Sequence, residues 1–294
     1  MKTVVYQSFR TKDVPSWIEA CLESVRQWAK LRGFEYRFYD DRFFDLVPAD
    51  LRPRASAFKC VLADYARLVA ARDLLAEGFE RAVWVDADAL VFAPESFEIT
   101  NDHGYAFSRE VWLDRITFGR PQFRLSVNNA VSVFCRDQKI IDFALDVADE
   151  ILRGDQPLEP VSIGTDFLSK LRNAFAYPLL TQVGILGAEM AQRYLANDGR
   201  FLSAYLSFQT SPIYAVNLCL SKHSGGGGVH EPVFNEADTL ALIKSLKADQ
   251  GRSINAWFTP SPPRANEKFD WPISPYLASR HSARLLLKSI QNRR

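Results

Sequence analysis

Two aspartates, Asp86 and Asp88, are the residues that point most clearly to chemistry, because they end an apolar run. The run, residues 82–85, reads Ala-Val-Trp-Val and is typical of a buried strand. Side chains at positions i and i+2 of a strand point to the same side, so both carboxylates face one point if the strand continues through them. Burying two like charges together is costly unless a positive charge compensates. A hard divalent cation, which prefers oxygen ligands, would do so.

The elements before this pair alternate between strand and helix. Strands are predicted over 3–9, 34–39 and 81–85, and helices over 15–32 and 57–77. This alternation predicts an α/β fold whose sheet is mainly parallel and covered by helices on both faces. Ligands in such folds bind outside the carboxyl ends of the strands, which is where Asp86 and Asp88 lie.

The rest of the chain gives weaker patterns. A loop is predicted over 40–55, and the segment 188–206 has mixed helical and aromatic character. Further strands are predicted over 104–107, 130–134 and 214–220, and further helices over 139–153, 166–175 and 235–248.

Composition excludes several classes of protein. The 294 residues are 47% hydrophobic and 24% charged, as in an ordinary globular protein with a core large enough to need no disulfides. The net charge of +1 does not suggest a nucleic-acid binder. No stretch of 18 apolar residues and no secretory signal are evident, so we expect a cytoplasmic protein. The four separated cysteines are predicted to be reduced core residues: Cys21, Cys60, Cys135 and Cys219.

The block around the aspartates resembles one found in sugar-nucleotide glycosyltransferases of the GT-A fold, families 8 and 32. In those families an Asp-x-x-Arg helix leads through a glycine turn to a strand that ends in Asp-x-Asp. Here Asp64 and Arg67 stand in the helix, Gly78 follows it, and Asp86 and Asp88 end the strand. The resemblance is specific over 57–92 and looser over 1–235.

The resemblance implies a fold and an activity. The fold would be a Rossmann-like GT-A domain over 1–258, with a mixed, mainly parallel sheet flanked by helices. A Pro/Ser linker and a basic C-terminal tail helix would follow over 259–294. The activity would be transfer of a sugar from a UDP-sugar or another nucleoside-diphosphate sugar to a carbohydrate or lipid-linked acceptor, with retention of configuration.

The resemblance also implies a metal site. Asp86 and Asp88, with Ala87 between them, would hold Mn²⁺ or Mg²⁺ against the diphosphate of the donor. A late His-x-x-Gly segment supplies a third metal ligand in family 8, and His223 with Gly226 fits that pattern. His230 is the alternative ligand, and the glycines around Gly226 would let the backbone approach the phosphates.

Four residues at the end of the first strand are candidates for holding the base and ribose of the nucleotide: Tyr6, Gln7, Ser8 and Arg10. An aromatic ring suits base stacking, and an amide suits hydrogen bonds to a base edge. Asp64 and Arg67 either line the donor pocket or form a weak surface ion pair, since both fall off the apolar stripe of their helix.

The sugar-binding side rests on three further residues. Asn128 and Asn129 stand where family 8 has an Asn-x-Gly strand entry that touches the donor sugar, although the glycine is replaced. Asp166 would lie near the anomeric carbon or bind the acceptor, and it could act as a base in an inverting enzyme. The alternative for Asp166 is a helix N-cap.

Two other functions remain open from the sequence. A phosphohydrolase of the haloacid-dehalogenase type also ends a strand in Asp-x-Asp, with the first aspartate as nucleophile. A non-catalytic sugar-nucleotide-binding protein would share the same binding residues. The basic segment 279–294 would either lie on an anionic membrane surface or dock as a helix on the domain.

Overall fold

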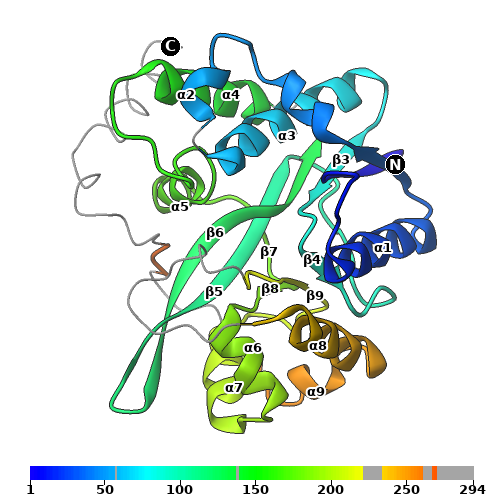
Figure 1. Ribbon diagram of the computed structural model, residues 1–294, viewed down its shortest axis with the longest axis vertical. Helices are drawn as coiled ribbons and strands as arrows, with labels where there is room; N and C mark the ends of the chain where they lie inside the picture. The colour runs from blue at the N-terminus through cyan, green and yellow to red at the C-terminus, as the bar shows by residue number, and fades with distance from the viewer. Residues whose placement is uncertain (57, 137–138, 221–233, 261–266, 270–294) are drawn as a thin grey trace.

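A six-stranded sheet forms the centre of the protein (Figure 1). The structure is a computed structural model, and it describes residues 1–56, 58–136, 139–220, 234–260 and 267–269. The strand order is β2-β1-β3-β6-β5-β7. Neighbours pair in parallel except for β6, which is antiparallel to both β3 and β5, so the sheet is mixed and mainly parallel as predicted. The strands are β1 (Thr3–Ser8), β2 (Glu35–Tyr39), β3 (Arg81–Val85), β5 (Tyr105–Thr117), β6 (Arg120–Cys135) and β7 (Leu179–Leu180).

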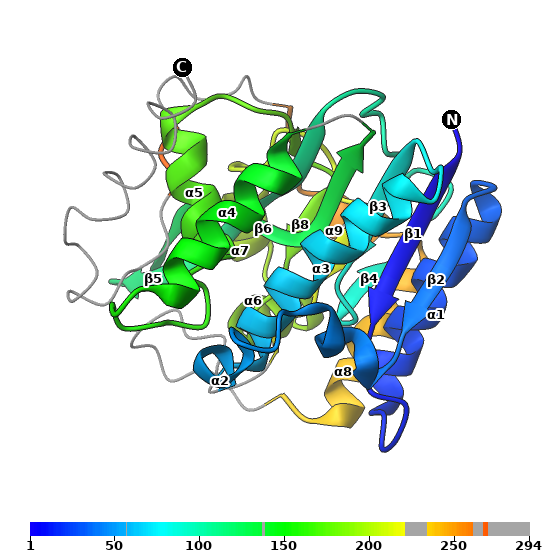
Figure 2. The ribbon, with the colours of Figure 1, turned by 90° about the horizontal axis from the view of Figure 1, so that it is seen from above.

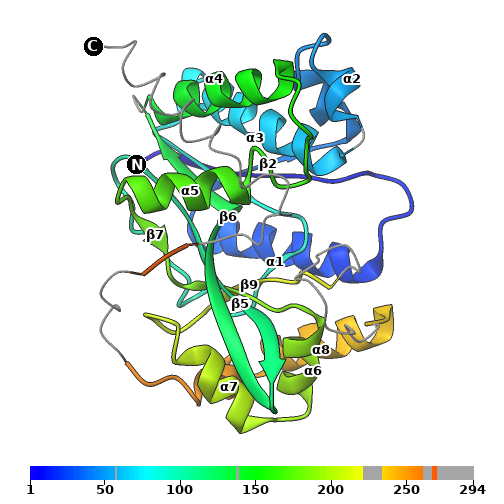
Figure 3. The same ribbon diagram turned by 90° about the vertical axis from the view of Figure 1, so that its left-hand side faces the viewer.

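Helices cover both faces of this sheet. Alternate residues of β1 and β3 enter different core clusters: Tyr6 and Trp84 pack with α3, whereas Val5 and Val83 pack with α1. Accordingly α3 (Lys59–Ala76) and α4 (Ile140–Arg153) lie on one side and α1 (Ser16–Leu31) lies on the other (Figures 2 and 3). The α/β architecture expected from the alternation of elements is therefore confirmed.

A second, three-stranded sheet packs next to the end of β3. Its order is β4-β9-β8, formed by β4 (Ala89–Val91), β9 (Ala215–Asn217) and β8 (Val183–Ile185). Because β4 follows directly after the two aspartates, its antiparallel pairing with β9 brings a segment about 130 residues downstream to their side. The strand predicted over 214–220 is thus shorter than expected.

The largest departure from the sequence-based expectation is the long β5–β6 hairpin, which runs from the central sheet to the level of α7 at the lower left of Figure 1. Short strands were predicted at 104–107 and 130–134, but β5 and β6 have 13 and 16 residues. The charged residues Arg109 and Glu110 interrupt the apolar pattern, although both are buried. The turn is tight, with Phe118 and Gly119 both at positive φ (49° and 71°).

The remaining elements are short helices. The predicted loop 40–55 contains a 3₁₀ helix and one helical turn, and the ambiguous segment 188–206 forms two helices. These elements are η1 (Asp41–Leu46), α2 (Arg52–Ala55), α5 (Thr165–Ala174), α6 (Ala188–Leu195), α7 (Gly199–Leu206), α8 (Glu236–Ala248) and α9 (Arg252–Asn255). No helix in the described ranges is both long and apolar enough to span a bilayer.

The prediction that all four cysteines lie in the core is wrong for one of them. Cys21 and Cys135 are buried and Cys219 is intermediate, but Cys60 is exposed on the first turn of α3. Position 60 falls on the outer face of the helix, which the apolar company of this residue in the sequence does not reveal. All four are free thiols, as expected.

The segment beyond 258 is not purely a linker. Phe269 is 2% exposed and belongs to the main core cluster, and its backbone forms an isolated bridge with Leu125 of β6. The side-chain amide of Asn173 on α5 brackets this residue: its Nδ2 donates to the Phe269 carbonyl (2.6 Å) and its Oδ1 accepts from the Phe269 N–H (2.9 Å). Glu267 pairs with the buried Arg109 at 2.7 Å. The predicted tail helix lies outside the described residues.

Replacing Phe269 with alanine should therefore destabilise the whole domain by about 3 kcal/mol, the cost of removing a buried aromatic ring. Urea unfolding of Phe269→Ala against the unmodified chain measures this loss. Phe118→Ala is the matched control, because Phe118 is fully exposed and its removal should change stability by less than about 0.5 kcal/mol. Equal effects of the two substitutions would contradict the packing of this segment.

Candidate functional site

The two aspartates lie in a turn rather than in a continued strand. β3 ends at Val85, and the Ala89 N–H donates to the Asp86 carbonyl at 3.1 Å, which closes a tight turn. The Asp86 N–H donates to the Ala130 carbonyl on β6 (2.7 Å), so the neighbouring strand fixes the start of this turn. The strand therefore ends at Val85, as predicted, and the condition that it continues through both aspartates is not met. The carboxylates nevertheless remain close enough that the charge of Asp86 raises the pKa of Asp88.

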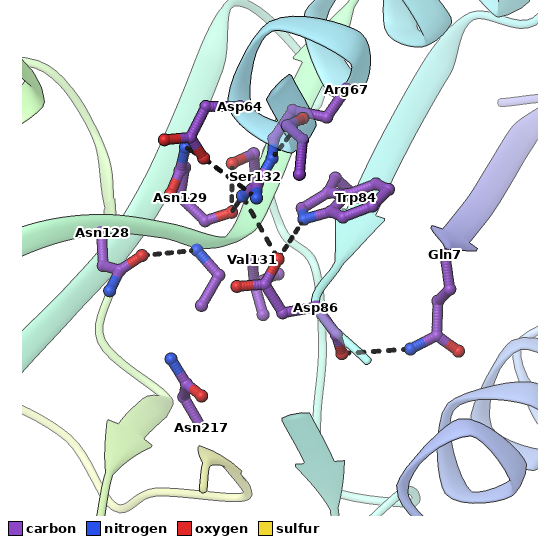
Figure 4. Close-up of polar contacts among 12 residues, drawn as sticks. Gln7, Asp64, Arg67, Trp84, Asp86, Asn128, Asn129, Val131, Ser132 and Asn217 are labelled. Carbon is purple, nitrogen blue, oxygen red and sulfur yellow. Dashed lines mark hydrogen bonds and ion pairs between the residues drawn. The ribbon is translucent and has the colours of Figure 1, made fainter. Parts of the chain in front are cut away.

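Arg67 is the centre of the polar contacts drawn in Figure 4. Its Nη1 lies 3.2 Å from Asp86 Oδ1 and its Nη2 lies 3.0 Å from Asp64 Oδ1. Nη1 also donates to the Asn129 carbonyl at 2.8 Å, and the guanidinium stacks 4.7 Å from the ring centroid of Trp84. A planar guanidinium is suited to such multiple contacts, so Arg67 orients carboxylates from two different elements.

Trp84 and Gln7 fix Asp86 further. The indole Nε1 of Trp84 donates to Asp86 Oδ1 at 2.6 Å. The amide of Gln7 donates to the Asp86 carbonyl at 3.2 Å (Figure 4) and accepts from the Tyr36 hydroxyl at 3.0 Å. Both side-chain contacts of Asp86 among the described residues involve Oδ1, so its other carboxylate oxygen carries no contact there that would compete with a ligand.

Asp64 and Arg67 are buried, so the interpretation of them as a weak surface pair is wrong. The sequence pattern misleads because α3 is covered on more than one side, by β3 and α4. Asp64 Oδ1 also accepts from Asn129 Nδ2 at 2.9 Å. The structure thus brings together four of the predicted site residues: Asp64, Arg67, Asp86 and Asn129.

Gly164 packs against this group at the start of α5. A Cβ atom added to Gly164 would lie 2.5 Å from Asp64 Oδ2 and 3.2 Å from Asn129 Nδ2. Any side chain at position 164 would therefore have to displace Asp64 or Asn129.

We expect Gly164→Ala to lower stability by about 1–3 kcal/mol, the usual cost of overpacking a filled site, and to disturb the pairing of Asp64 with Arg67. Thermal unfolding measures the first effect. Gly187→Ala is the matched control at another helix N-cap, because its added Cβ would meet its nearest atom at 4.0 Å. If Gly164→Ala unfolds at the same temperature as Gly187→Ala, the close approach to Asp64 is not as described.

Glu110, which the sequence analysis did not single out, lies beside the aspartates. It is fully buried on β5, and its Oε2 accepts from Trp112 Nε1 (2.8 Å) and Asn128 Nδ2 (2.9 Å). Its Oε1 accepts from Asn217 Nδ2 on β9 at 3.4 Å. The predicted residue Asn128 is therefore held by Glu110 at one end of its amide, while its Oδ1 accepts from the Ala130 N–H at 2.9 Å.

The electrostatics of this region are dominated by carboxylates. Burial, followed by the charge of Asp86, raises the pKa of Asp88 to about 7. Burial also raises the pKa of Asp64 to about 6 and that of Glu110 to about 7, although nearby donors favour their ionised forms. Within the described ranges, Arg67 is the basic residue that pairs with Asp64 and Asp86. A region with two buried carboxylates, Asp64 and Glu110, two partly exposed ones, Asp86 and Asp88, and one guanidinium is suited to binding a cation.

The candidate nucleotide-binding residues at the end of β1 differ in how accessible they are to a ligand. The ring of Tyr6 is completely buried against Tyr39 and Trp84, and its hydroxyl donates to the Arg67 carbonyl at 2.8 Å. Tyr6 therefore supports α3 and offers no free face for a base, so the expected stacking role is wrong. Ser8 is partly exposed, and the exposed Arg10 donates to the Asp13 carbonyl; a contact of either with a nucleotide stays a prediction.

Asp166 is in the first turn of α5, where its carboxylate pairs with Lys170 Nζ at 2.7 Å. The N-cap is Gly164, so the capping interpretation of Asp166 is wrong. No described contact joins Asp166 to Asp86 or Asp88, and its catalytic role stays a prediction. His223, Gly226 and His230 lie outside the described residues.

Among the described residues, acidic, histidine and cysteine side chains do not by themselves form a complete metal site. Within the described part of the chain, no group of three or more such side chains is placed to hold a metal ion. Asp86 and Asp88 fit a hard cation by their chemistry, since both are oxygen ligands, and further oxygens would have to complete the shell.

Sequence reasoning missed three residues that shape this site: Trp84, Glu110 and Asn217. Glu110 was missed because two adjacent charged residues, Arg109 and Glu110, usually indicate the end of a strand. Their burial is visible only in the folded structure. Asn217 and Asp88 are distant in sequence, and only the pairing of β4 with β9 reveals their proximity.

Comparisons with known proteins show a distant likeness to solved structures. No family model matches the chain, and no curated protein matches it. A similar solved structure is the "crystal structure of a glycosyltransferase involved in the glycosylation of the major capsid of PBCV-1". It is 8% identical with a TM-score of 0.45, and the match covers 83% of this chain and 100% of that chain. At this level of likeness, the function has to be derived from the residues of the site.

Proposed function

We propose that the protein is a metal-dependent glycosyltransferase. It would move a sugar from a nucleoside-diphosphate sugar to a carbohydrate or lipid-linked acceptor, with retention of configuration. The observation that carries this proposal is the group of carboxylates at the carboxyl end of β3, of which Asp64 is buried and Asp86 and Asp88 are partly exposed. Arg67 pairs with Asp64 and Asp86, whereas no ion pair involves Asp88 among the described residues. The carboxyl ends of strands are where α/β folds bind ligands.

Asp86 and Asp88 would hold the cation, Mn²⁺ or Mg²⁺. When bound, the cation stabilises the negative charge that develops on the departing diphosphate. Arg67 and Trp84 keep Asp86 Oδ1 occupied, which leaves its Oδ2 for the cation. Gln7 fixes the backbone of the same residue, so the binding oxygens are positioned before the donor arrives.

Asn128 and Asn129 are held differently, and this difference suggests their roles. Asn129 is part of the Arg67–Asp64 network, so it supports the metal side. Asn128 is held by Glu110 and the Ala130 N–H, further along β6 toward the hairpin, where the donor sugar would lie. Asp166 and Ser8 remain candidates for acceptor and nucleotide contacts.

The hydrolase alternative fits this arrangement less well. A haloacid-dehalogenase enzyme uses the first aspartate as a nucleophile, but Asp86 is fixed through Oδ1 by a guanidinium and an indole N–H. Both contacts stabilise the carboxylate charge and so reduce its nucleophilicity.

The test is to offer the purified protein a panel of sugar nucleotides, with and without Mn²⁺, and to measure release of nucleoside diphosphate. We expect metal-dependent release from at least one donor and its loss in Asp88→Ala. Release of phosphate from simple phosphate esters would point to the hydrolase instead. Tight binding of a donor without turnover in the presence of any acceptor would refute the proposed enzymatic activity and favour a non-catalytic binding protein.

A further inference from the structure

Asn217 presents an oxygen that lacks a partner. This side chain is 4% exposed, and its Oδ1 is buried with no hydrogen-bond donor within reach among the residues that the structure describes. A buried acceptor left unpaired costs stability comparable to a lost hydrogen bond, so its presence calls for an explanation.

The position of Asn217 puts this oxygen next to the aspartates. In the antiparallel ladder between β4 and β9, Asn217 pairs with Ala89, the residue that follows Asp88. The next residue, Leu218, donates its N–H to the Asp88 carbonyl at 3.0 Å. In Figure 4 the side chain of Asn217 rises from β9 toward Asn128, below Asp86.

Glu110 determines which way the amide of Asn217 faces. An ionised carboxylate only accepts hydrogen bonds, so it turns the N–H₂ end of an amide toward itself. Glu110 does this to two amides, from Asn128 at 2.9 Å and from Asn217 at 3.4 Å. The oxygen of Asn128 then accepts the Ala130 N–H, whereas the oxygen of Asn217 accepts no hydrogen bond from the described part of the chain.

We infer that Asn217 Oδ1 is an oxygen ligand of the cation held by Asp86 and Asp88, and that Glu110 is the positioning residue that turns this oxygen to the cation. Amide oxygens are ordinary ligands of hard cations, and partners behind a ligand commonly fix its orientation. The inference rests on the proposed metal-dependent function. It explains why a fully buried carboxylate on β5 contacts residues of both sheets.

The experiment measures Mn²⁺ binding by the full-length protein without nucleotide, from the electron paramagnetic resonance signal of free Mn²⁺. We expect Asn217→Ala and Glu110→Gln each to weaken Mn²⁺ binding by about tenfold or more. Trp112→Phe is the matched control, since it removes one donor to Glu110 but keeps its charge and its contact with Asn217. It should change the Mn²⁺ affinity by less than about twofold.

The double variant separates positioning from simple charge loss. If Glu110 acts through Asn217, then Glu110→Gln in the Asn217→Ala background adds little, and the two effects are strongly non-additive. Fully additive effects would show that Glu110 acts on the cation by its own charge, and they would overturn its positioning role. Unchanged affinity in Asn217→Ala would overturn the ligand itself.

The Asn217→Asp variant distinguishes loss of a metal ligand from loss of folding in Asn217→Ala. It keeps an oxygen and adds a negative charge, so Mn²⁺ binding should equal or exceed that of the unmodified chain, opposite to alanine. Weakening by both substitutions would overturn the inference. Failure of the proposed function looks different: the unmodified chain would then bind no Mn²⁺, or would bind it without acting on any sugar nucleotide.

Discussion

Asp88→Asn is expected to abolish sugar transfer while making the folded protein more stable at pH 8. Loss of one cation ligand should reduce Mn²⁺-dependent turnover by at least about 100-fold. The stability change has the opposite sign because the partial burial of Asp88, and after it the charges of Asp86 and Glu110, raise the pKa of Asp88 to about 7. Removing a charge that is unfavourable in the folded state should stabilise the protein by about 2 kcal/mol at pH 8.

The pH dependence follows from the direction of the same shift. The pKa of Asp88 is higher in the folded state than the ordinary value of 3.8, so the folded state binds more protons over this range. The contribution of this residue to stability is therefore present below about pH 4 and is lost as the pH rises to about 7. Urea unfolding should show the advantage of Asp88→Asn growing from pH 4 to pH 8.

The control for this effect is Asp155→Asn, which neutralises an exposed aspartate. Its stability should follow that of the unmodified chain at every pH. Mn²⁺ should raise the unfolding temperature of the unmodified chain and of Asp155→Asn, but not that of Asp88→Asn. A destabilised Asp88→Asn at pH 8 without metal would mean that Asp88 is already compensated by a partner in the protein.

Arg67→Met should produce the largest loss of stability, about 3–5 kcal/mol. The substitution leaves the buried Asp64 and the partly exposed Asp86 without their guanidinium, and breaking a buried ion pair such as Arg67–Asp64 from one side has this cost. Arg67→Lys should recover only part of the loss, since a single ammonium cannot make the separate contacts to both carboxylates and to the Asn129 carbonyl. Urea unfolding at pH 8 measures both variants.

Two comparisons test the cause of that loss. Arg72→Met on the same helix removes an exposed guanidinium and should cost less than about 0.5 kcal/mol. Asp64→Asn should partly rescue Arg67→Met because it removes one of the two stranded charges. If the double variant is as unstable as the sum of the single variants, then Arg67 does not act by compensating Asp64.

The sequence by itself determined the local elements and the first half of the site. Apolar runs and helical spacing placed β1, α1, α3 and β3 to within a few residues, because these elements bury one continuous face and end at glycine or polar residues. The position of Asp86 and Asp88 after β3 followed directly, as did the proximity of α3, which carries Asp64 and Arg67.

Only the tertiary structure decided how these residues are paired and what surrounds them. Because α3 is covered on several sides, Asp64 and Arg67, which were expected at the surface, are buried. The ring of Tyr6 is also completely buried, so it is no longer a candidate for base stacking. The lengths of β5 and β6 were unreadable because Arg109 and Glu110 break the apolar pattern of a strand that tertiary contacts nevertheless bury.

Asn217 shows most clearly why the sequence alone does not reveal the surroundings of the aspartates. Its partner Glu110 is 107 residues away in sequence, and its neighbour Ala89 is even further. The pairing of β4 with β9 depends on register between distant strands, which no local periodicity encodes. The sequence therefore located the two aspartates, whereas the fold determined which side chains from distant strands lie around them.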